Sequence, residues 1–257
     1  MNQDTFKKNY TMQSLHKAIR VLKAFTREEP RLSLTELNKK TGIGISSLQR
    51  FVSTLVYEGF LHKDERTKQY QLGLSLMVLG KLVEEESSLL TVAAPVLKRL
   101  NEQVGESVAL NIIDGHERRC IYNLDSTFTL TAKTYVGDTA PLHAGASAKT
   151  LLAFLTLEEQ KAYIEEEELV AVTDLTITDG ETLLDNLAEI RKNGVAISRG
   201  ERVRGAFSVS APILSYTGRP IASITMIIPD LRKDDYDEEA LKKQIMNAAR
   251  EIEQKLS

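Results

Sequence analysis

Residues 32 to 70 constrain the fold most strongly, because they read as two short helices separated by a glycine-containing turn and followed by a two-stranded ribbon. Ser33 and Glu36 have the Ser-x-x-Glu spacing of a capping box, which marks the first turn of a helix. This helix is expected to end near Gly42, since glycine readily adopts the left-handed conformation of a helix C-cap. A first helix, over residues 12 to 27, is predicted to pack one apolar face against this pair.

A further helix is predicted for residues 45 to 58, where apolar residues recur at helical spacing. They are Leu48, Phe51, Val52, Leu55 and Val56, and the opposite face carries Ser46, Ser47, Gln49, Arg50, Ser53 and Thr54. One face can therefore pack on the other helices while the polar face enters a DNA major groove. Gln49 and Arg50 can each make paired hydrogen bonds to one base, whereas Ser46 and Ser47 can contact phosphates or base edges. For this helix taken alone, a solvated polar face without a ligand is the alternative.

A basic hairpin is predicted after Gly59, with strands at residues 60 to 63 and 68 to 72 around a polar tip. Together with the helices it forms a winged helix-turn-helix, a DNA-binding arrangement. The cations Lys63, Arg66 and Lys68 can reach phosphates or an adjacent minor groove. Ordinary exposed hairpin charges are the alternative for each of them.

The charge distribution agrees with a DNA-binding N-terminal part. The whole chain has a net charge of only −3, yet residues 1 to 72 contain 13 Lys and Arg against 7 Asp and Glu. The remaining residues contain 20 against 29. Such asymmetry is typical of a chain in which one part meets phosphate and the other does not, although surface charge also varies without function.

The overall composition indicates a soluble, cytoplasmic protein of two domains. Its 257 residues suffice for two hydrophobic cores, and its single cysteine, Cys120, cannot form an internal disulfide. No apolar run approaches the roughly 18 residues of a membrane span, and residues 1 to 10 lack the apolar centre of a secretory signal. We expect those residues to form a mobile polar arm.

Residues 91 to 257 predict an α+β domain around an antiparallel sheet. Asp114-Gly115 marks a hairpin between strands at residues 107 to 113 and 118 to 123. Further strands are expected at residues 128 to 135, 195 to 198, 206 to 214 and 221 to 228. Helices are expected at residues 91 to 104, 146 to 155, 157 to 167, 181 to 193 and 237 to 256. Pro95 would be tolerated in the first turn of the first of these helices.

From residue 12 onward the sequence resembles the family of IclR-type transcription regulators. The N-terminal carriers of the resemblance are Ser14-Leu15, Ala18-Ile19, Val21-Leu22, LSLTEL at 32 to 37, Gly42-Ile43, Ser46-Ser47, Arg50, Gly59-Phe60-Leu61 and Tyr70-x-Leu72-Gly73. The C-terminal carriers are Gly194-Val-Ala-Ile, Glu201, Gly205, Ser210-Ala211-Pro212, Gly218 and the strand from Ala222 to Ile228. Gly44-Ile45 departs from the Lys or Pro of many relatives, so a phosphate contact common there is not expected here.

The resemblance implies three parts. They are a winged helix-turn-helix DNA-binding domain at 12 to 73, a linker helix at 74 to 90, and a GAF-like α+β effector-binding domain at 91 to 257. The DNA-contacting set is expected to be Ser33, Thr35, Ser46, Ser47, Gln49, Arg50, Ser53, Lys63, Arg66 and Lys68.

The loop from Pro141 to Lys149 is rich in small residues, which let a backbone approach a ligand closely, and it precedes a helix N-terminus suited to an anion. In the resemblance this is the effector-binding loop, although Ala148 replaces its usual Gly and Gly145 its usual Thr. The backbone at Gly145 and Ala146 would then meet the carboxylate of a small organic acid. Ser198, Ser208 and Thr225 would add polar contacts, and Ile227, which stands where some acid-binding relatives have a hydroxyl, would face an apolar part of the ligand. The alternative is that these Ser and Thr residues merely populate strands.

Two other chemistries can be drawn from this part of the chain. Ser147 near Lys149 or His143 suggests a nucleophile with its base for acyl or amide chemistry, but Ser-x-Lys does not place both groups on one helical face. His116, Cys120 and His143 could hold a metal, although hairpin spacing does not suit such a site. We therefore expect no catalytic residue, no metal and no cofactor.

The combined prediction is a sequence-specific DNA-binding transcription regulator, a repressor rather than an activator, whose operator binding responds to a small organic acid. Its partners would be a double-stranded operator and a second copy of itself, with half-sites a whole number of helical turns apart and no membrane involved. The helix at 12 to 27 and the linker helix are the expected pairing surfaces. The resemblance implies a possible tetramer, as a dimer of dimers. The alternatives are the Ser147 enzyme and a winged-helix protein-interaction module that binds no DNA.

Overall fold

The structure, a computed structural model, describes residues 12–256. The predicted polar arm at residues 1 to 10 lies outside the described residues. The chain divides into two compact units between Glu86 and Ser87. We call them the N-terminal unit and the C-terminal unit and describe each by itself. Within residues 12–256 no helix has both the length and the apolarity needed to span a bilayer.

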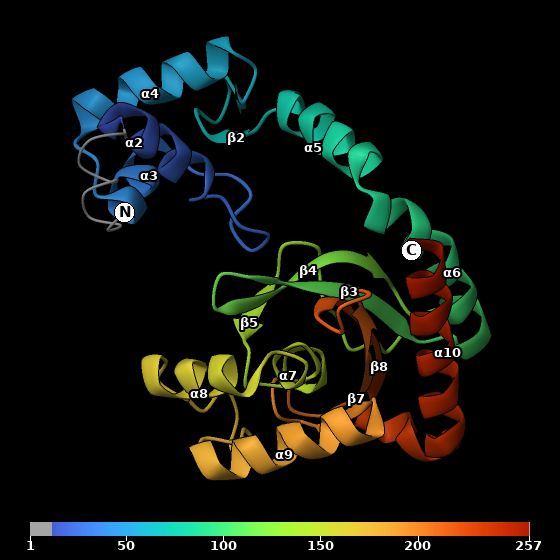
Figure 1. The fold of residues 1–257 in the computed structure, drawn as a ribbon. Coiled ribbons are helices and arrows are strands. Elements are labelled where there is room, and N and C mark those ends of the chain that lie inside the picture. The colour runs from blue at the N-terminus through green and yellow to red at the C-terminus, as the bar shows by residue number, and fades with distance from the viewer. Residues whose placement is uncertain (1–11, 257) are drawn as a thin grey trace. The chain divides into compact units, whose positions relative to one another are not determined.

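The N-terminal unit is a winged helix-turn-helix, as predicted (Figure 1). Its elements are α2 (Gln13–Leu22), α3 (Leu34–Thr41), α4 (Ile45–Tyr57), β1 (Leu61–Lys63) and β2 (Tyr70–Leu72). The two strands pair in antiparallel register, and Leu32 adds a bridge to Tyr70. The three helices and the wing share one apolar core, formed by Val21, Phe25, Leu32, Leu37, Ile43, Leu48, Val52, Leu55, Leu61 and Tyr70.

The turn between α3 and α4 follows from local sequence. The capping box is present, because Ser33 accepts the backbone N–H of Glu36 while the Glu36 carboxylate accepts the backbone N–H of Ser33. At the other end of α3, Gly42 takes a left-handed conformation with φ of 66°. The Asn38 amide donates to the Ile43 carbonyl at 2.8 Å. This fixes the direction in which α4 leaves the turn, with Ile43 buried in the core.

The predicted linker helix divides differently from expectation. α5 (Leu74–Glu86) ends before Leu90, because the Ser87 hydroxyl caps a new helix, α6 (Ser88–Val104), by accepting the Leu90 N–H at 3.3 Å. The early start of α6 also places Pro95 inside the helix, so the prediction of a first-turn proline is wrong. The side chain of Pro95 faces solvent. The Thr91 carbonyl that loses its helical partner there is on an exposed residue, where water can satisfy it.

The C-terminal unit contains a six-stranded antiparallel sheet, in agreement with the predicted α+β class. Its strands are β3 (Ser107–Asp114), β4 (Glu117–Leu124), β5 (Thr139–Pro141), β6 (Ala196–Arg199), β7 (Ala206–Leu214) and β8 (Pro220–Pro229). Their order across the sheet is β5-β4-β3-β8-β7-β6, with each neighbouring pair antiparallel.

Helices cover both faces of this sheet (Figure 1). α6 and α10 (Glu238–Leu256) lie side by side on one face, over the apolar core. α7 (Ala146–Ala153) packs on the opposite face with α9 (Gly180–Asn193), and α8 (Leu157–Glu166) lies beside them. A short 3-10 helix, η1 (Asp230–Asp235), connects β8 to α10.

Alternation along β8 explains why the two faces differ. Ala222, Ile224, Met226 and Ile228 belong to the core beneath α6 and α10. The intervening residues include Ser223, Thr225 and Ile227, which therefore point to the face where α7 begins. A face that mixes hydroxyls with apolar groups is suited to a small ligand.

The strand predicted for residues 128 to 135 is wrong, since this segment has no regular structure. The edge of β4 that it would need is taken by β5, which was not predicted and pairs with residues Glu117, Arg118 and Arg119. Cys120 extends this pairing, because its N–H donates to the Asp138 carbonyl and its carbonyl accepts the Gly137 N–H. Residues 128 to 135 are thereby left outside the sheet.

Candidate nucleic-acid interface and ligand pocket

α4 presents an exposed polar face opposite its buried one. Leu48, Val52 and Leu55 are buried in the core of the N-terminal unit. The predicted polar residues are all exposed: Ser46, Ser47, Gln49, Arg50, Ser53 and Thr54. The amide of Gln49 donates to the Ser53 hydroxyl at 3.2 Å, which holds two of these side chains together along the helix.

The first turn of α4 is open to an anion. Its N-cap, Gly44, has no side chain with which to cap the first backbone N–H groups. Ser46 and Ser47 lie in that turn and are exposed. The free N–H groups of a helix N-terminus attract phosphate, so this end suits a DNA backbone even without the Lys or Pro common in relatives.

The predicted contacts on α3 differ in availability. The Ser33 hydroxyl is engaged in the capping box, because it also donates to the Glu36 carboxylate at 2.7 Å. Thr35, in the first turn of α3, is exposed. We therefore place Ser33 as a residue that shapes α3, with Thr35 as the side chain free to reach a phosphate.

The wing carries its three predicted cations around a tight tip. The Asp64 carboxylate accepts the N–H groups of Arg66 and Thr67, and Lys68 adopts a φ of +59°. Lys63 and Lys68 both form ion pairs with Glu65, at 3.2 and 2.8 Å. Arg66 is exposed and has no ion pair among the described residues. Because exposed ion pairs are weak, phosphates can compete for both lysines.

In the C-terminal unit, the six residues predicted to contact an effector line one pocket. Gly145, Ala146, Ser198, Ser208, Thr225 and Ile227 all line it. The pocket lies between the N-terminal end of α7 and the sheet.

The backbone conformation at position 145, in the wall of the pocket, requires glycine. Its φ is +86°, a conformation that other residues rarely adopt, and an added Cβ would lie 3.2 Å from the Arg202 Cβ. The Gly145 N–H already has a partner within the protein, since it donates to Glu201 Oε2 at 3.3 Å. A ligand carboxylate at this N–H would have to displace that of Glu201.

A buried hydrogen-bond network supports the pocket floor. The Asn111 amide donates to Thr225 Oγ1 at 3.3 Å, and Thr225 donates to the Ser210 hydroxyl at 3.0 Å. Ser210 in turn donates to the Ile224 carbonyl at 2.8 Å. Thr225 thus links the pocket lining to neighbouring residues of β3, β7 and β8.

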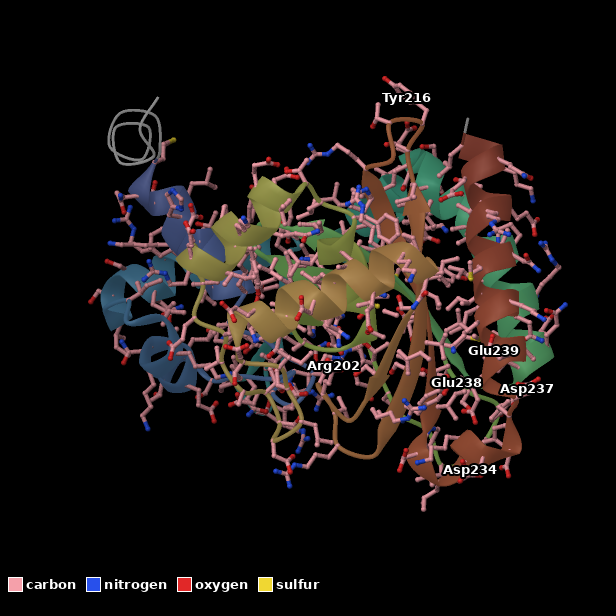
Figure 2. The ribbon with its side chains drawn as sticks, turned by 60° about the horizontal axis from the view of Figure 1, so that its bottom comes forward. Arg202, Tyr216, Asp234, Asp237, Glu238 and Glu239 are labelled. Carbon is pink, nitrogen blue, oxygen red and sulfur yellow. The ribbon has the colours of Figure 1, made fainter. Side chains whose placement is uncertain are left out.

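Two arginines that were not predicted line the same pocket. Arg118, on β4, is 1% exposed, and Arg202 lies in the loop that links β6 to β7 (Figure 2). Burial, assisted by the charge of Arg202, lowers the pKa of the Arg118 guanidinium to about 10. Burial also lowers the pKa of Arg202. Both side chains still carry a positive charge at neutral pH.

The groups suggested for catalysis have other partners. The ammonium of Lys149 is bound to Glu201 Oε1 at 2.7 Å and to the Asn186 amide oxygen at 2.9 Å, so it does not serve Ser147 as a base. The ring of His143 is buried between the Tyr163 hydroxyl and the Val170 carbonyl. These contacts give His143 a structural role.

The residues suggested for a metal do not gather. His116 pairs with Glu167 at 2.6 Å, and the Cys120 thiol contacts the Tyr122 carbonyl. Within residues 12–256 no cluster of three or more His, Cys, Asp or Glu side chains could hold a metal ion.

Comparison with known proteins gives matches to both units. Residues 14–65 match the model of the IclR helix-turn-helix domain, and residues 83–254 match that of the bacterial transcriptional regulator IclR C-terminal domain. The HTH-type transcriptional regulator KipR of Bacillus subtilis is 33% identical over 228 residues, which cover 89% of this chain and 91% of KipR.

Solved structures show the same fold. A putative transcriptional regulator from Rhodococcus has a TM-score of 0.85 at 27% identity and covers 96% of this chain and 98% of its own. An IclR homolog from Microbacterium hydrocarbonoxydans, solved in complex with 4-hydroxybenzoate, has a TM-score of 0.84 at 24% identity. The latter match covers 95% of this chain and 99% of the homolog.

Proposed function

The chain belongs to the IclR family of DNA-binding transcription regulators, and on that premise we propose how it reads DNA and what controls the reading. The exposed face of α4 enters the major groove of an operator, and the wing contacts the flanking backbone. A small organic acid in the pocket of the C-terminal unit alters the affinity for that operator. Repression is the proposed sign, because a bound protein blocks polymerase without any further contact surface.

The observation that carries the DNA-reading proposal is the exposed polar face of α4. Arg50 and Gln49 stand on this face without a buried partner, at the distance from the helix start where recognition helices read bases. Arg50 can make the bidentate contact with guanine that is the commonest specific contact, whereas Gln49 suits adenine. The other predicted contacts position the protein on the DNA backbone and do not distinguish between bases. They are Thr35, Ser46, Ser47, Ser53 and the wing cations.

The experiment begins with selection of an operator from a library of random duplexes, followed by binding titrations of the selected duplex and of a scrambled one. Arg50→Ala should cost roughly 1–3 kcal/mol on the selected duplex and relax the preference at one base position. Lys63→Ala is the matched control on the wing. This variant should weaken binding to both duplexes alike. It should also reduce the slope of log K against log salt concentration by about one.

Two outcomes would contradict this assignment. Unchanged discrimination between the two duplexes in Arg50→Ala would remove Arg50 from base reading. Failure of the wild-type protein to bind any duplex in a salt-dependent way would favour the protein-interaction module instead.

We also propose that the protein acts as a homodimer, with a tetramer of two dimers as a further possibility. One α4 with few charges binds weakly, and a dimer brings two such helices to half-sites one helical turn or a multiple of it apart. α2 and α5 are the proposed pairing surfaces, since both expose large apolar side chains. These are Met12, Leu15 and Ile19 before or within α2, and Leu74, Met77, Val78, Leu79, Leu82 and Val83 on α5.

For the effector we propose an organic acid in contact with the six predicted lining residues. The arginines that line the pocket support this, and the 4-hydroxybenzoate complex of the Microbacterium homolog is consistent with a carboxylate ligand. The family consists of transcription regulators and not of enzymes, so the chain is not an acyl-transfer enzyme that uses Ser147. A cytoplasmic location is proposed because that is where a bacterial operator is found.

A further inference from the structure

We propose that the effector is a small dianionic acid, a dicarboxylate, whose two carboxylates are bound by Arg118 and Arg202 rather than by the loop backbone at Gly145. This inference rests on the proposed effector pocket and specifies the ligand that it takes. It concerns residues of the C-terminal unit alone, so it can be tested independently of DNA binding.

Arg118 is a buried cation with unused donors. Its Nη1 donates to the Asn111 amide oxygen at 3.3 Å and to the Asp138 carbonyl at 3.2 Å. Its Nε and Nη2 are buried and have no hydrogen-bond partner among the described residues. A buried N–H without a partner is costly, and on a charged group more so. Because Arg118 lines the pocket, a ligand oxyanion there would satisfy both donors at once.

Arg202 adds a second cation to the same wall. Its Cβ lies 3.2 Å from the place that a Cβ on Gly145 would take, and Figure 2 marks it in the loop between β6 and β7. No ion pair of Arg202 is found within residues 12–256, and the same holds for Arg118. Asp138 is the carboxylate whose charge acts on both guanidiniums, but it forms no ion pair with either of them. The two guanidiniums therefore have no direct ion-pair partner among the described residues.

Two other cations of this unit, one buried and one partly buried, are paired within the protein. Arg232 binds Glu106 with two hydrogen bonds, at 2.7 and 2.9 Å, and also contacts the Leu130 carbonyl. Lys149 is bound to Glu201 and Asn186. The contrast indicates that Arg118 and Arg202 are not structural cations of this kind, and that their partner comes from outside the chain.

The charges lining the pocket set the charge of the ligand. The pocket lining contains three cations, Arg118, Lys133 and Arg202, but only one carboxylate, that of Glu201. Glu201 is already neutralised by Lys149 and occupies the Gly145 N–H, so it acts as a built-in anion at the loop. A single ligand carboxylate would leave one guanidinium without a direct ion-pair partner, whereas a dianion can pair with both.

The remaining lining suits the carbon chain of such an acid. Ala109, Ala132 and Ile227 provide an apolar surface in the same pocket. Ser198 and Ser208 sit opposite each other on paired strands and can orient an oxygen at the edge of that surface. A short acid with an oxyanion at each end matches this distribution of charged, apolar and hydroxyl groups.

The test uses calorimetric titration of the full-length protein at fixed ionic strength. The probes are malonate, succinate, glutarate and adipate, each beside its monomethyl ester, which has nearly the same size and one charge fewer. Inorganic phosphate and glycerol phosphate test a phosphoryl dianion as the alternative source of charge. At least one dicarboxylate should bind about tenfold or more tightly than its own monoester and more tightly than either phosphate.

Variants show whether the arginines cause this preference. In Arg202→Met and in Arg118→Met the preference for the diacid over its monoester should fall to near unity, and Arg202→Lys should restore part of it. Arg204→Met is the matched control, because Arg204 lies in the same loop, is exposed and pairs with Asp174. Arg202→Met should also raise the unfolding temperature of the ligand-free protein, since it removes an unpaired charge.

The proposal is overturned if every diacid binds no better than its monoester, if the preference survives in Arg202→Met, or if a phosphate binds best. Absence of binding by the whole series also overturns it. None of these results affects the proposed DNA reading, which the operator titration measures separately. Loss of operator binding by the wild-type protein would remove the proposed function while leaving the ligand titration interpretable.

Discussion

The ion pair between Lys149 and Glu201 shows how single residues shape the ligand pocket. The Lys149 side chain is almost fully buried within α7, and its ammonium bridges to the loop that contains Glu201 at 2.7 Å. The same carboxylate holds the Gly145 N–H. The pair therefore fixes two pocket walls against each other, and its loss would leave a buried carboxylate without its cation.

We predict that Lys149→Met destabilises the C-terminal unit by about 3–5 kcal/mol, because the unpaired Glu201 charge remains in the interior. Arg219→Met breaks an exposed pair with Glu159 and should cost only roughly 0–1 kcal/mol. Urea unfolding, followed by far-UV circular dichroism, measures the free energy of unfolding of both variants. Equal costs for the two variants would show that the buried pair does not hold the walls together.

At the residue scale, the sequence predicted where side chains lie when their placement follows from local pattern or from the family resemblance, whereas their roles in binding stay predictions. The polar face of α4 and the six pocket residues were placed by helical spacing and by resemblance. Arg118 and Arg202 were missed, because an arginine in a strand or loop is ordinarily exposed. The available signal was alternation on β4, which puts Arg118 on the same face as the buried Cys120. This alternation indicates a buried Arg118 only when it is known that both faces of the sheet are covered.

At the scale of elements, the capping box decides whether α3 forms at the right place. Ser33 and Glu36 close it at the mouth of α3. The pKa of the Glu36 carboxyl is lowered from its ordinary value of 4.5, chiefly because it accepts the Ser33 N–H and also the Ser33 hydroxyl. A lowered pKa means that the contact stabilises the folded state above about pH 4.5 and that this stabilisation is lost as the pH falls through the lowered pKa.

Ser33→Ala should therefore destabilise α3 by about 1 kcal/mol at neutral pH, with a smaller difference from wild type at acidic pH. Hydrogen exchange of the α3 amides is the suitable measurement, because it reports one element within a two-unit protein. Thr35→Ala is the neighbouring control and should leave the exchange unchanged. A pH-independent difference would mean that Glu36 has no part in the cap.

Whether an element could be predicted depended on how local its cause is. The ends of α3, capped by Ser33 and Gly42, and the hairpin at Asp114-Gly115 were placed correctly because their geometry depends on a few adjacent residues. The segment at 128 to 135 has the composition of a strand, but the edge of β4 pairs with β5 instead. Pro95 was placed wrongly because the cap at Ser87, several residues earlier, starts the helix sooner. Which of two segments pairs with a sheet edge cannot be predicted from the few residues of either segment alone.

At the scale of the whole molecule, α5 carries large apolar side chains that its own unit leaves exposed. None of its residues is buried, although Leu74, Met77, Val78, Leu82 and others on it are large and apolar. A contiguous exposed apolar surface of this kind commonly marks a protein interface. A second copy of the chain is the occupant proposed above.

Leu82→Glu should shift the protein from dimer to monomer in sedimentation velocity, because it places a charge within that apolar surface. Tyr216→Glu is the matched control. Tyr216 is also exposed and lies at the tip between β7 and β8 in the C-terminal unit (Figure 2). The control should keep the wild-type mass. A Leu82→Glu protein that stays dimeric would exclude the middle of α5 as a pairing surface.

The central claim is that a dicarboxylate held by Arg118 and Arg202 changes the affinity of the protein for its operator. The most direct measurement is the operator dissociation constant of the wild type and of Arg202→Met, with and without a saturating concentration of the diacid that binds best. Coupling between two sites is typically about 5–150-fold, and we predict a change in this range for the wild type and no change for Arg202→Met. An operator affinity that is the same with and without bound diacid in the wild type, or that changes equally in the variant, would contradict the account.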